Sequence, residues 1–447
     1  MKRILLGTAA TLMLGIAANA ADMPTKAPLL KAPPVVSYDW TGAYIGGYFG
    51  DAISNAKVHT DGLASGIADL NEKGVTVGGT AGYNWQFYSR FLVGAEIDFG
   101  WLSLNRSIMQ WNDFVNLGEN VDWNGTARLR VGYVTGPSLL YVTGGGALVH
   151  TRDSFGGTAT AGPTMDSAIR SGWTAGGGIE TRLSRSWTAK TEYLYMNVGQ
   201  SNFGSNVFGG TFATTFDHSL HVIKTGLNYK LGEPLFDGLP LFGTSTLRSD
   251  HNWTGFYLGA NVGGGISNVR SLGGGGTLGL GTEEGVNGTD LGGGAMAGYN
   301  YVLGRTFLGT WFVGAEADYG YLGIQGSQRD WNDTVTFRDK TTWYATARAR
   351  VGTTTGPALL YFTGGAAWVH LTDTFALIGA TSQLDRTASG WTFGGGTEVA
   401  IDPRWSARIE SLYIDAGHDN LAVGAAHGDF KDRFTVVRVG VSAKIWP

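Results

Sequence analysis

The stretch that decides the fold reads Val93-Gly94-Ala95-Glu96-Ile97-Asp98-Phe99-Gly100. Apolar side chains alternate in it with Gly or a carboxylate, which is the period-2 pattern of a β-strand with two different faces. The run Val313-Gly314-Ala315-Glu316 repeats the same pattern later in the chain. Because one face carries acids and the other only apolar groups, the two faces must lie in different surroundings.

The composition of the 447-residue chain also favours strands. Gly occurs 72 times, more than twice its usual share of about 7%, and each Gly inside a helix costs roughly 1 kcal/mol. The 32 basic and 36 acidic residues nearly balance, so nucleic acid is not an expected partner. Cys is absent, which excludes disulfides, thiol catalysis and cysteine metal sites.

The N-terminal segment has the features of a secretory signal peptide over residues 1–20. Lys2 and Arg3 precede an apolar run over 4–16, and Ala18-Asn19-Ala20 supplies small residues for cleavage. An uncleaved membrane anchor is the alternative. Residues 21–39 contain four Pro and are predicted to form an extended tether.

The rest of the chain is a tandem duplication. Trp40 begins a motif that returns at Trp253, and Thr126 begins one that returns at Thr346, so the offset grows from 213 to 220. The copies are predicted to span residues 40–231 and 253–447, joined by a linker over 232–252 that is rich in Gly and Pro.

Eight strands are predicted in each copy from the alternation. In the first they lie near 40–51, 74–86, 91–104, 123–135, 138–152, 170–183, 186–198 and 217–231. In the second they lie near 253–268, 290–303, 310–324, 341–354, 358–372, 386–401, 404–416 and 431–445. The predicted connections alternate between tight turns and long polar loops (52–73, 105–122, 153–169 and 199–216), which is typical of outer-membrane barrels.

The polar face of the strands carries four acids and four bases in each copy. In the first copy they are Glu96, Asp98, Arg128, Arg130, Glu180, Lys190, Glu192 and Lys224. In the second they are Glu316, Asp318, Arg348, Arg350, Glu398, Arg408, Glu410 and Arg438. A membrane barrel turns its apolar face to lipid and its charges inward. The predicted fold class is therefore an all-β transmembrane antiparallel β-barrel with an inward charge network.

The sixteen strands are compatible with two eight-stranded barrels or with one sixteen-stranded barrel. Each copy supplies its own balanced set of charges, which favours two closed barrels with filled interiors. Both copies also end in a similar strand, which begins at Lys224 in the first and at Arg438 in the second. This strand resembles the closing strand that the barrel-assembly machinery reads in outer-membrane proteins.

The tether that begins at Ala21-Asp22-Met23-Pro24, followed by Trp40-Thr41-Gly42-Ala43-Tyr44, resembles the alphaproteobacterial outer-membrane immunogenic protein family. This small porin family falls within the outer-membrane-protein-A-like barrels. The resemblance implies an eight-stranded barrel in the outer membrane with a structural or porin-like role, and some relatives bind haem or host surfaces. The tandem copy is a departure, because family members usually have one barrel.

The sequence predicts no catalytic residue, cofactor or metal site, and no enzymatic activity. The inward carboxylates all have basic neighbours, and His150, His218, His221 and His370 are interpreted as isolated interfacial side chains. The expected function is envelope integrity with porin-like passage of small solutes. The alternative is a binding module for haem or host ligands through the long loops. The expected partners are outer-membrane lipid, lipopolysaccharide and the assembly machinery, and the oligomeric state stays open.

Overall fold

The computed structural model describes residues 38–446, except for 62–65, 89, 111–114, 157–163, 208–209, 236–250, 268, 275–282, 287–288, 307–308, 331–334, 355–356, 378 and 424–425. Across these residues the regular elements are all strands, which confirms the all-β prediction. No helix in this part of the chain is long and apolar enough to cross a bilayer. The predicted signal peptide, most of the tether and most of the linker lie outside the described residues.

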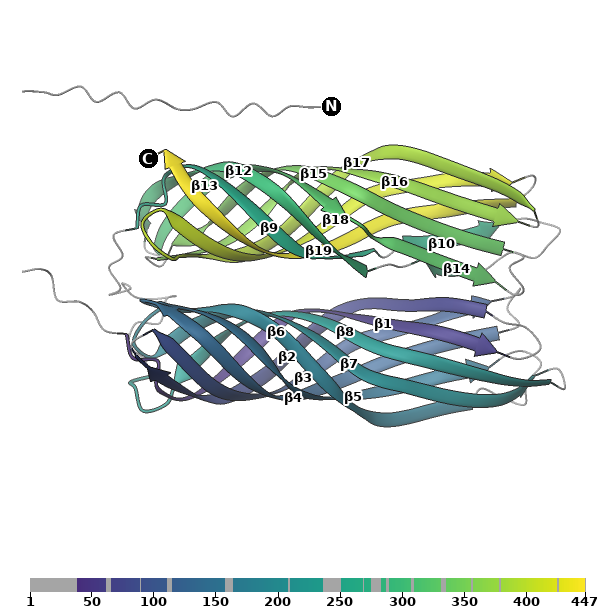
Figure 1. Ribbon diagram of the computed structural model, residues 1–447, viewed down its shortest axis with the longest axis horizontal. Helices are drawn as coiled ribbons and strands as arrows, with labels where there is room; N and C mark the ends of the chain where they lie inside the picture. The colour runs from purple at the N-terminus through teal and green to yellow at the C-terminus, as the bar shows by residue number, and fades with distance from the viewer. Residues whose placement is uncertain are drawn as a thin grey trace, which may run out of the picture. The chain divides into compact units, whose positions relative to one another are not determined.

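The first copy forms one closed barrel of eight antiparallel strands (Figure 1). Its strands are β1 (Gly42–Asp61), β2 (Gly66–Phe87), β3 (Phe91–Gln110), β4 (Val115–Thr135), β5 (Ser138–Gly156), β6 (Thr164–Arg182), β7 (Trp187–Val207) and β8 (Gly210–Lys230). Each strand pairs with the next, and β8 pairs with β1 from Lys230 opposite Tyr44 to Ala213 opposite Asp61. This pairing closes the barrel.

The second copy closes in the same way, although three of its eight barrel strands are each interrupted and divided into two segments. Its strands are β9 (Gly255–Ser267), β10 (Val269–Gly274), β11 (Glu283–Val286), β12 (Thr289–Thr306), β13 (Gly309–Leu322), β14 (Gln325–Asp330), β15 (Val335–Thr354), β16 (Ala358–Leu377), β17 (Ala380–Ala400), β18 (Trp405–Val423) and β19 (Ala426–Trp446). β19 pairs with both β9 and β10. Two tandem barrels are therefore confirmed, and the sixteen-stranded alternative is wrong.

The predicted long loops are wrong in extent, because the strands continue well into them. β1 runs to Asp61 and β2 starts at Gly66, so most of the predicted loop 52–73 is paired strand. The same holds for 105–122, 153–169 and 199–216. A bulge adds a residue to one strand and reverses its alternation. Both copies contain such shifts, for example between Val121 and Trp123 and between Thr341 and Trp343. Beyond a shift the alternation is out of step with the rest of the strand, so a search for period 2 ends there.

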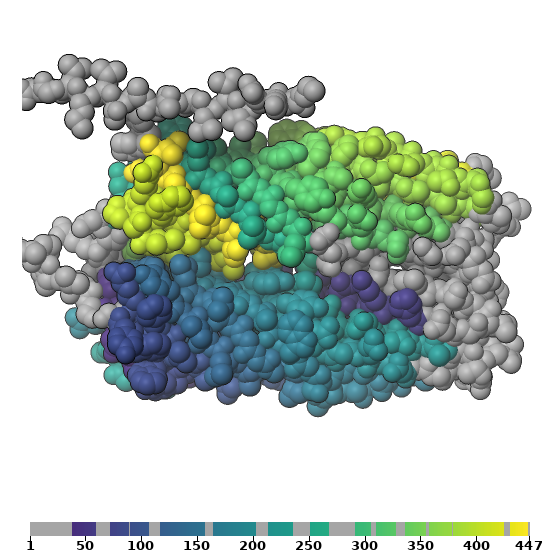
Figure 2. All heavy atoms as spheres, in the orientation of Figure 1, coloured from purple at the N-terminus to yellow at the C-terminus, as the bar shows by residue number. Residues whose placement is uncertain are grey.

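The outward face of each barrel is apolar over a limited height. On β3 it runs from Phe91 through Ile97, which is 61% exposed, to Trp101, and Asn105 follows. Aromatic residues at both ends of such a stretch mark the interfaces of a membrane barrel. We take the segment between them as membrane-spanning, and we call the strand ends beyond Trp101 and its counterparts the outer end. In Figure 2 the strands of the first copy, purple to teal, form a closely packed wall.

Candidate functional site inside the barrels

The interior of the first barrel is built around Arg128 on β4. Its Nη2 atom donates to Glu96 at 2.6 Å and to Asp98 at 2.5 Å, both on the facing β3, and its Nη1 atom donates to Glu192 on β7 at 2.9 Å. The register places Glu96 directly opposite Arg128. One guanidinium therefore joins three carboxylates across the lumen, which uses the fork geometry that only Arg offers.

The other charges of the first copy complete this layer. Arg130 reaches Glu180 at 3.1 Å, and Lys190 reaches Glu96 at 2.7 Å. Lys224 lies 2.8 Å from Asp98 and 3.2 Å from Glu192. The eight side chains are all buried. Buried charges are tolerated when each has an opposite partner and further hydrogen bonds, and this layer supplies both.

The second copy repeats the layer with four arginines. Arg348 contacts Asp318 at 2.6 Å, Glu410 at 2.9 Å and also Glu316. The other three arginines also bind acids of their own copy. Arg350 pairs with Glu398 at 2.8 Å and Arg408 pairs with Glu316. Arg438 pairs with both Asp318 and Glu410. The structure thus places the sixteen predicted charges inside the barrels, in one network per copy.

Buried tyrosines, which were not predicted from the sequence, extend both networks. Tyr44 donates to Glu96 at 2.6 Å, and Tyr257 of the second copy donates to Glu316 at the same distance. Gly82 and Gly298 make room for them, because a Cβ at either glycine would collide with the tyrosine hydroxyl. The signal was present in the alternation, since Tyr44 shares its strand face with inward glycines.

The charged layer is closed on both sides. Toward the outer end it is followed by a buried apolar cluster, which in the first copy includes Leu102, Val149, Leu194, Met196 and Leu220. Toward the short turns, a pocket beside Trp40 and Glu180 encloses about 20 Å³. Such a volume holds about one water molecule. The described interior is therefore filled by side chains.

A second polar layer lies beyond the apolar cluster at the outer end of the first barrel. His218 on β8 lies between Glu119 and Asp153, with Nδ1 2.9 Å from the first and Nε2 3.1 Å from the second. Burial alone would lower the pKa of His218. The hydrogen bonds to these two acids and their charges outweigh burial and raise the pKa from 6.5 to about 9. The interfacial interpretation of His218 is wrong, because its side chain is fully buried in the lumen.

The other three histidines singled out in the sequence, His150, His221 and His370, behave differently from His218. His150 stacks on Trp123 and its Nδ1 lies 2.9 Å from Asp122, and His370 stacks on Trp343. His221 shares a 2.8 Å hydrogen bond with the hydroxyl of Tyr193. Each is thus packed against an aromatic side chain of the barrel wall.

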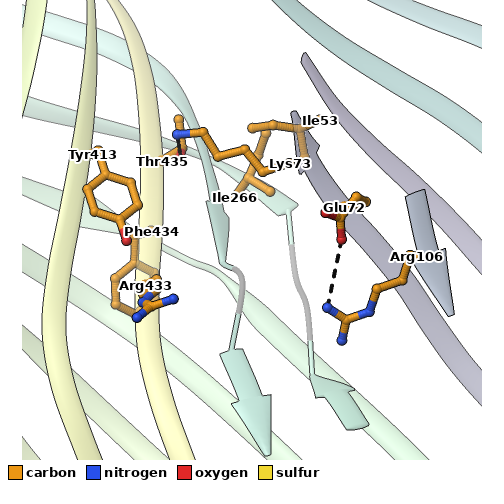
Figure 3. A pocket seen from close by; sticks show the side chains of 9 residues that line it. All are labelled: Ile53, Glu72, Lys73, Arg106, Ile266, Tyr413, Arg433, Phe434 and Thr435. Carbon is orange, nitrogen blue, oxygen red and sulfur yellow. Dashed lines mark hydrogen bonds and ion pairs between the residues drawn. The ribbon is translucent and has the colours of Figure 1, made fainter. Parts of the chain in front are cut away.

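Two further cations balance the outer layer of the first copy. Arg170 pairs with Asp153 at 3.2 Å and with the half-exposed Asp166 at 2.6 Å. Arg106 pairs with Glu72 at 3.8 Å, as the dashed line in Figure 3 shows, and the register places Arg106 opposite Glu119. The buried members of this layer are therefore two acids, Glu119 and Asp153, and two bases, His218 and Arg106.

The outer layer of the second copy is acidic instead. Asp339, Asp373 and Asp432 bring carboxylate oxygens within 4.8 Å of one another. Burial and the neighbouring carboxylates raise the pKa of Asp339 well above its usual range and that of Asp432 to about 8. This cluster is not predicted from the sequence, because Asp339 lies on the outer side of the bulge of β15, where the alternation is reversed.

The sequence is similar to known outer-membrane proteins over almost its whole length. The profile of the outer membrane protein β-barrel domain matches residues 8–230 and again residues 238–444. The 31 kDa outer-membrane immunogenic protein of Brucella melitensis is 34% identical over 243 residues, which are 52% of this chain and 100% of that protein. The 22 kDa outer membrane protein of Rhizobium leguminosarum is 30% identical over 208 residues, 45% of this chain and 82% of that protein.

Solved structures give weaker likenesses. Neisserial surface protein A is 16% identical and covers 43% of this chain and 98% of its own, with a TM-score of 0.24. A Pseudomonas aeruginosa FadL homologue is 9% identical and covers 90% of each chain, with a TM-score of 0.28. Scores of this size carry no argument about function.

Proposed function

Because the chain belongs to the outer membrane protein β-barrel domain family, we propose that it is a non-enzymatic structural component of the bacterial outer membrane. In this proposal residues 1–20 direct export and are cleaved. The apolar outward faces contact lipid and lipopolysaccharide, and the closing strands β8 and β19 are read by the barrel-assembly machinery. Two barrels on one chain then cover twice the membrane area of a single-barrel relative and support envelope integrity.

The observation that carries the proposal is the filled lumen. Four acids and four bases of the first copy bind one another at the level of the membrane, and an apolar cluster follows them toward the outer end. Eight-stranded barrels have room for side chains but not for a channel. Passage of small solutes is therefore expected to be rare and of small conductance.

Planar-bilayer recording of the refolded full chain tests the plug. The unaltered chain is expected to give silence or rare small openings. The pair Arg128→Ser and Glu192→Ser removes one cation and one acid from the centre of the layer, so it is expected to give more frequent openings. A stable large conductance from the unaltered chain contradicts the proposal.

A deletion strain tests the structural role. Loss of the gene is expected to increase sensitivity to detergent and to large antibiotics, and the plugged chain supplied in trans is expected to restore resistance. Unchanged sensitivity contradicts a role in envelope integrity.

The alternative function, a module for haem or host ligands, depends on long loops. The strand pairing through Asp61 and Gly66 shortens the first of these loops. Both ring nitrogens of His218 already face carboxylates. These observations favour the structural role over haem binding at the described residues.

A further inference from the structure

The outer layer of the second barrel contains carboxylates that lack partners. Asp339, Asp373 and Asp432 are at most 1% exposed. Among the residues that the structure describes, neither oxygen of Asp339 nor either oxygen of Asp373 has a hydrogen-bond partner outside the cluster, and Oδ1 of Asp432 has none. Leaving ionised groups buried and unpaired is strongly unfavourable, so the cluster must take up either protons or a partner of positive charge.

The first copy shows what fills this place when the sequence provides a cation. Glu119 lies opposite Asp153 on β4 and β5, just as Asp339 lies opposite Asp373 on β15 and β16. His218, six residues before Lys224, donates to both acids of the first copy. Its counterpart, six residues before Arg438, is Asp432. The second copy thus carries a carboxylate where the first carries an imidazolium.

Two other replacements make the second site more acidic. Arg106 lies opposite Glu119, whereas Gly326 lies opposite Asp339. Ser201, two residues after Gly199, corresponds to Asp419, two residues after Gly417. The cation that the structure describes beside these acids is Arg386, which binds Asp432 at 2.7 Å and also pairs with Asp419. Four carboxylates and one guanidinium leave a formal charge of −3.

The spacing and the surroundings of the carboxylates suit calcium. Two oxygens that bind one Ca²⁺ at about 2.4 Å lie at most about 4.8 Å apart, and the three carboxylates satisfy that limit. On the outer side of the three aspartates lies a buried apolar cluster that contains Phe337, Phe375 and Phe430. Each phenylalanine is two residues from one of the aspartates, toward the outer end of the same strand. A dry site disfavours Mg²⁺, which retains several waters, and favours Ca²⁺, which accepts bidentate carboxylates.

We propose that Asp339, Asp373 and Asp432 bind one calcium ion at the outer end of the second barrel. The ion replaces the positive charge that His218 supplies in the first barrel. Arg386 holds Asp419 and one oxygen of Asp432, and the unpartnered oxygens of the three acids are the ligands. The ion stabilises the long outer strands of the second copy, which carry these residues past the bulge.

The decisive experiment exchanges the residue that distinguishes the two copies. The full chain is refolded in detergent without lipopolysaccharide at a series of buffered CaCl₂ concentrations, because the phenylalanine cluster closes the site and the ion must enter during folding. After free ion is removed on a desalting column, the calcium retained per chain is measured by atomic absorption and thermal unfolding by circular dichroism. One ion per chain and a higher Tm with CaCl₂ are expected. Asp432→His is expected to fold and to weaken binding at least about 100-fold, because it restores the arrangement of the first copy.

The matched control changes the first copy at the equivalent acids. Glu119→Gln with Asp153→Asn is expected to leave calcium binding unchanged, whereas Asp339→Asn with Asp373→Asn is expected to abolish it. Absence of saturable binding by the unaltered folded chain would show that protons neutralise the cluster and would overturn the proposal. Binding that survives Asp432→His, or equal affinity for MgCl₂, overturns the calcium site as well.

Discussion

The charged layers of the two barrels hold the same acids with different cations. Lys224 of the first copy reaches two carboxylates and lies 4.4 Å from the centre of the Tyr48 ring. Arg438 of the second copy reaches the two equivalent carboxylates and donates to the hydroxyl of Tyr344 at 2.9 Å. The tyrosine that contacts the cation therefore differs between the copies, as the cation itself does.

The tyrosine has moved from one strand to another between the copies. Tyr48 on β1 corresponds to Asn261 on β9, and Asn124 on β4 corresponds to Tyr344 on β15. All four side chains are buried in the lumen. Arginine is longer than lysine, so Arg438 packs against a tyrosine on β15, whereas Lys224 packs against one on β1. The cation and the tyrosine therefore differ together between the two tightly packed interiors. The copies therefore diverge in packing while the acids that bind the central guanidinium are kept.

The largest expected effect comes from removing that central guanidinium. Arg128→Leu in the first copy and Arg348→Leu in the second each leave three buried carboxylates without their shared partner. Breaking a buried ion pair costs about 3–5 kcal/mol. We expect both substitutions to lower the free energy of unfolding by that amount, measured by urea titration of the refolded chain.

An exposed pair provides the control for this comparison. Arg152 is more than half exposed and lies 2.8 Å from Asp122. Arg152→Leu is expected to cost less than about 1 kcal/mol. A cost for Arg348→Leu as small as that of Arg152→Leu would show that the second network does not stabilise its barrel.

A smaller effect is expected from pH, and only the first copy has the histidine that causes it. The pKa of His218 is raised from 6.5 to about 9 in the folded chain, so its stabilising charge is fully present below pH 6.5 and lost as the pH rises through 9. Each pH unit between these values is worth about 1.4 kcal/mol. We expect about 3 kcal/mol less stability above pH 9 than at pH 6, measured by urea unfolding across this range.

The comparison variant is His218→Gln, which cannot take up a proton. Its stability is expected to change less with pH than that of the unaltered chain, by the amount that His218 contributes. Parallel pH profiles for the two proteins would contradict a charged His218.

The sequence allowed the central layer to be predicted but not the outer one, for a physical reason. Glu96 and Arg128 lie on the unbroken segments 91–101 of β3 and 123–135 of β4, so their shared inward face follows from period 2 alone. Glu119 and Asp339 lie beyond bulges, where the same rule assigns them to the wrong face. Closure of the barrels depends on the pairing of β8 with β1 and of β19 with β9, which alternation cannot determine.

Overpacking the lumen is expected to be less costly than removing a charge. Gly82→Ala and Gly298→Ala direct a methyl group onto the hydroxyls of Tyr44 and Tyr257. Each is expected to cost about 2 kcal/mol in unfolding free energy, because a buried hydrogen bond to a carboxylate must shift. Gly47→Ala is the control, since its Cβ would lie 3.9 Å from the nearest atom. Equal stability of all three variants would show that the tyrosines adjust freely.

The smallest expected effect tests the exchange of lysine and arginine itself. Lys224→Arg alone places a longer cation against Tyr48 and is expected to cost about 1 kcal/mol. Adding Tyr48→Asn and Asn124→Tyr reproduces the second copy, in which Arg438 donates to Tyr344. The triple variant is expected to recover most of the loss, a coupling energy measurable by comparing the single, double and triple variants in urea. Additive losses would mean that the two lumens tolerate either cation, and that the tyrosine moved for another reason.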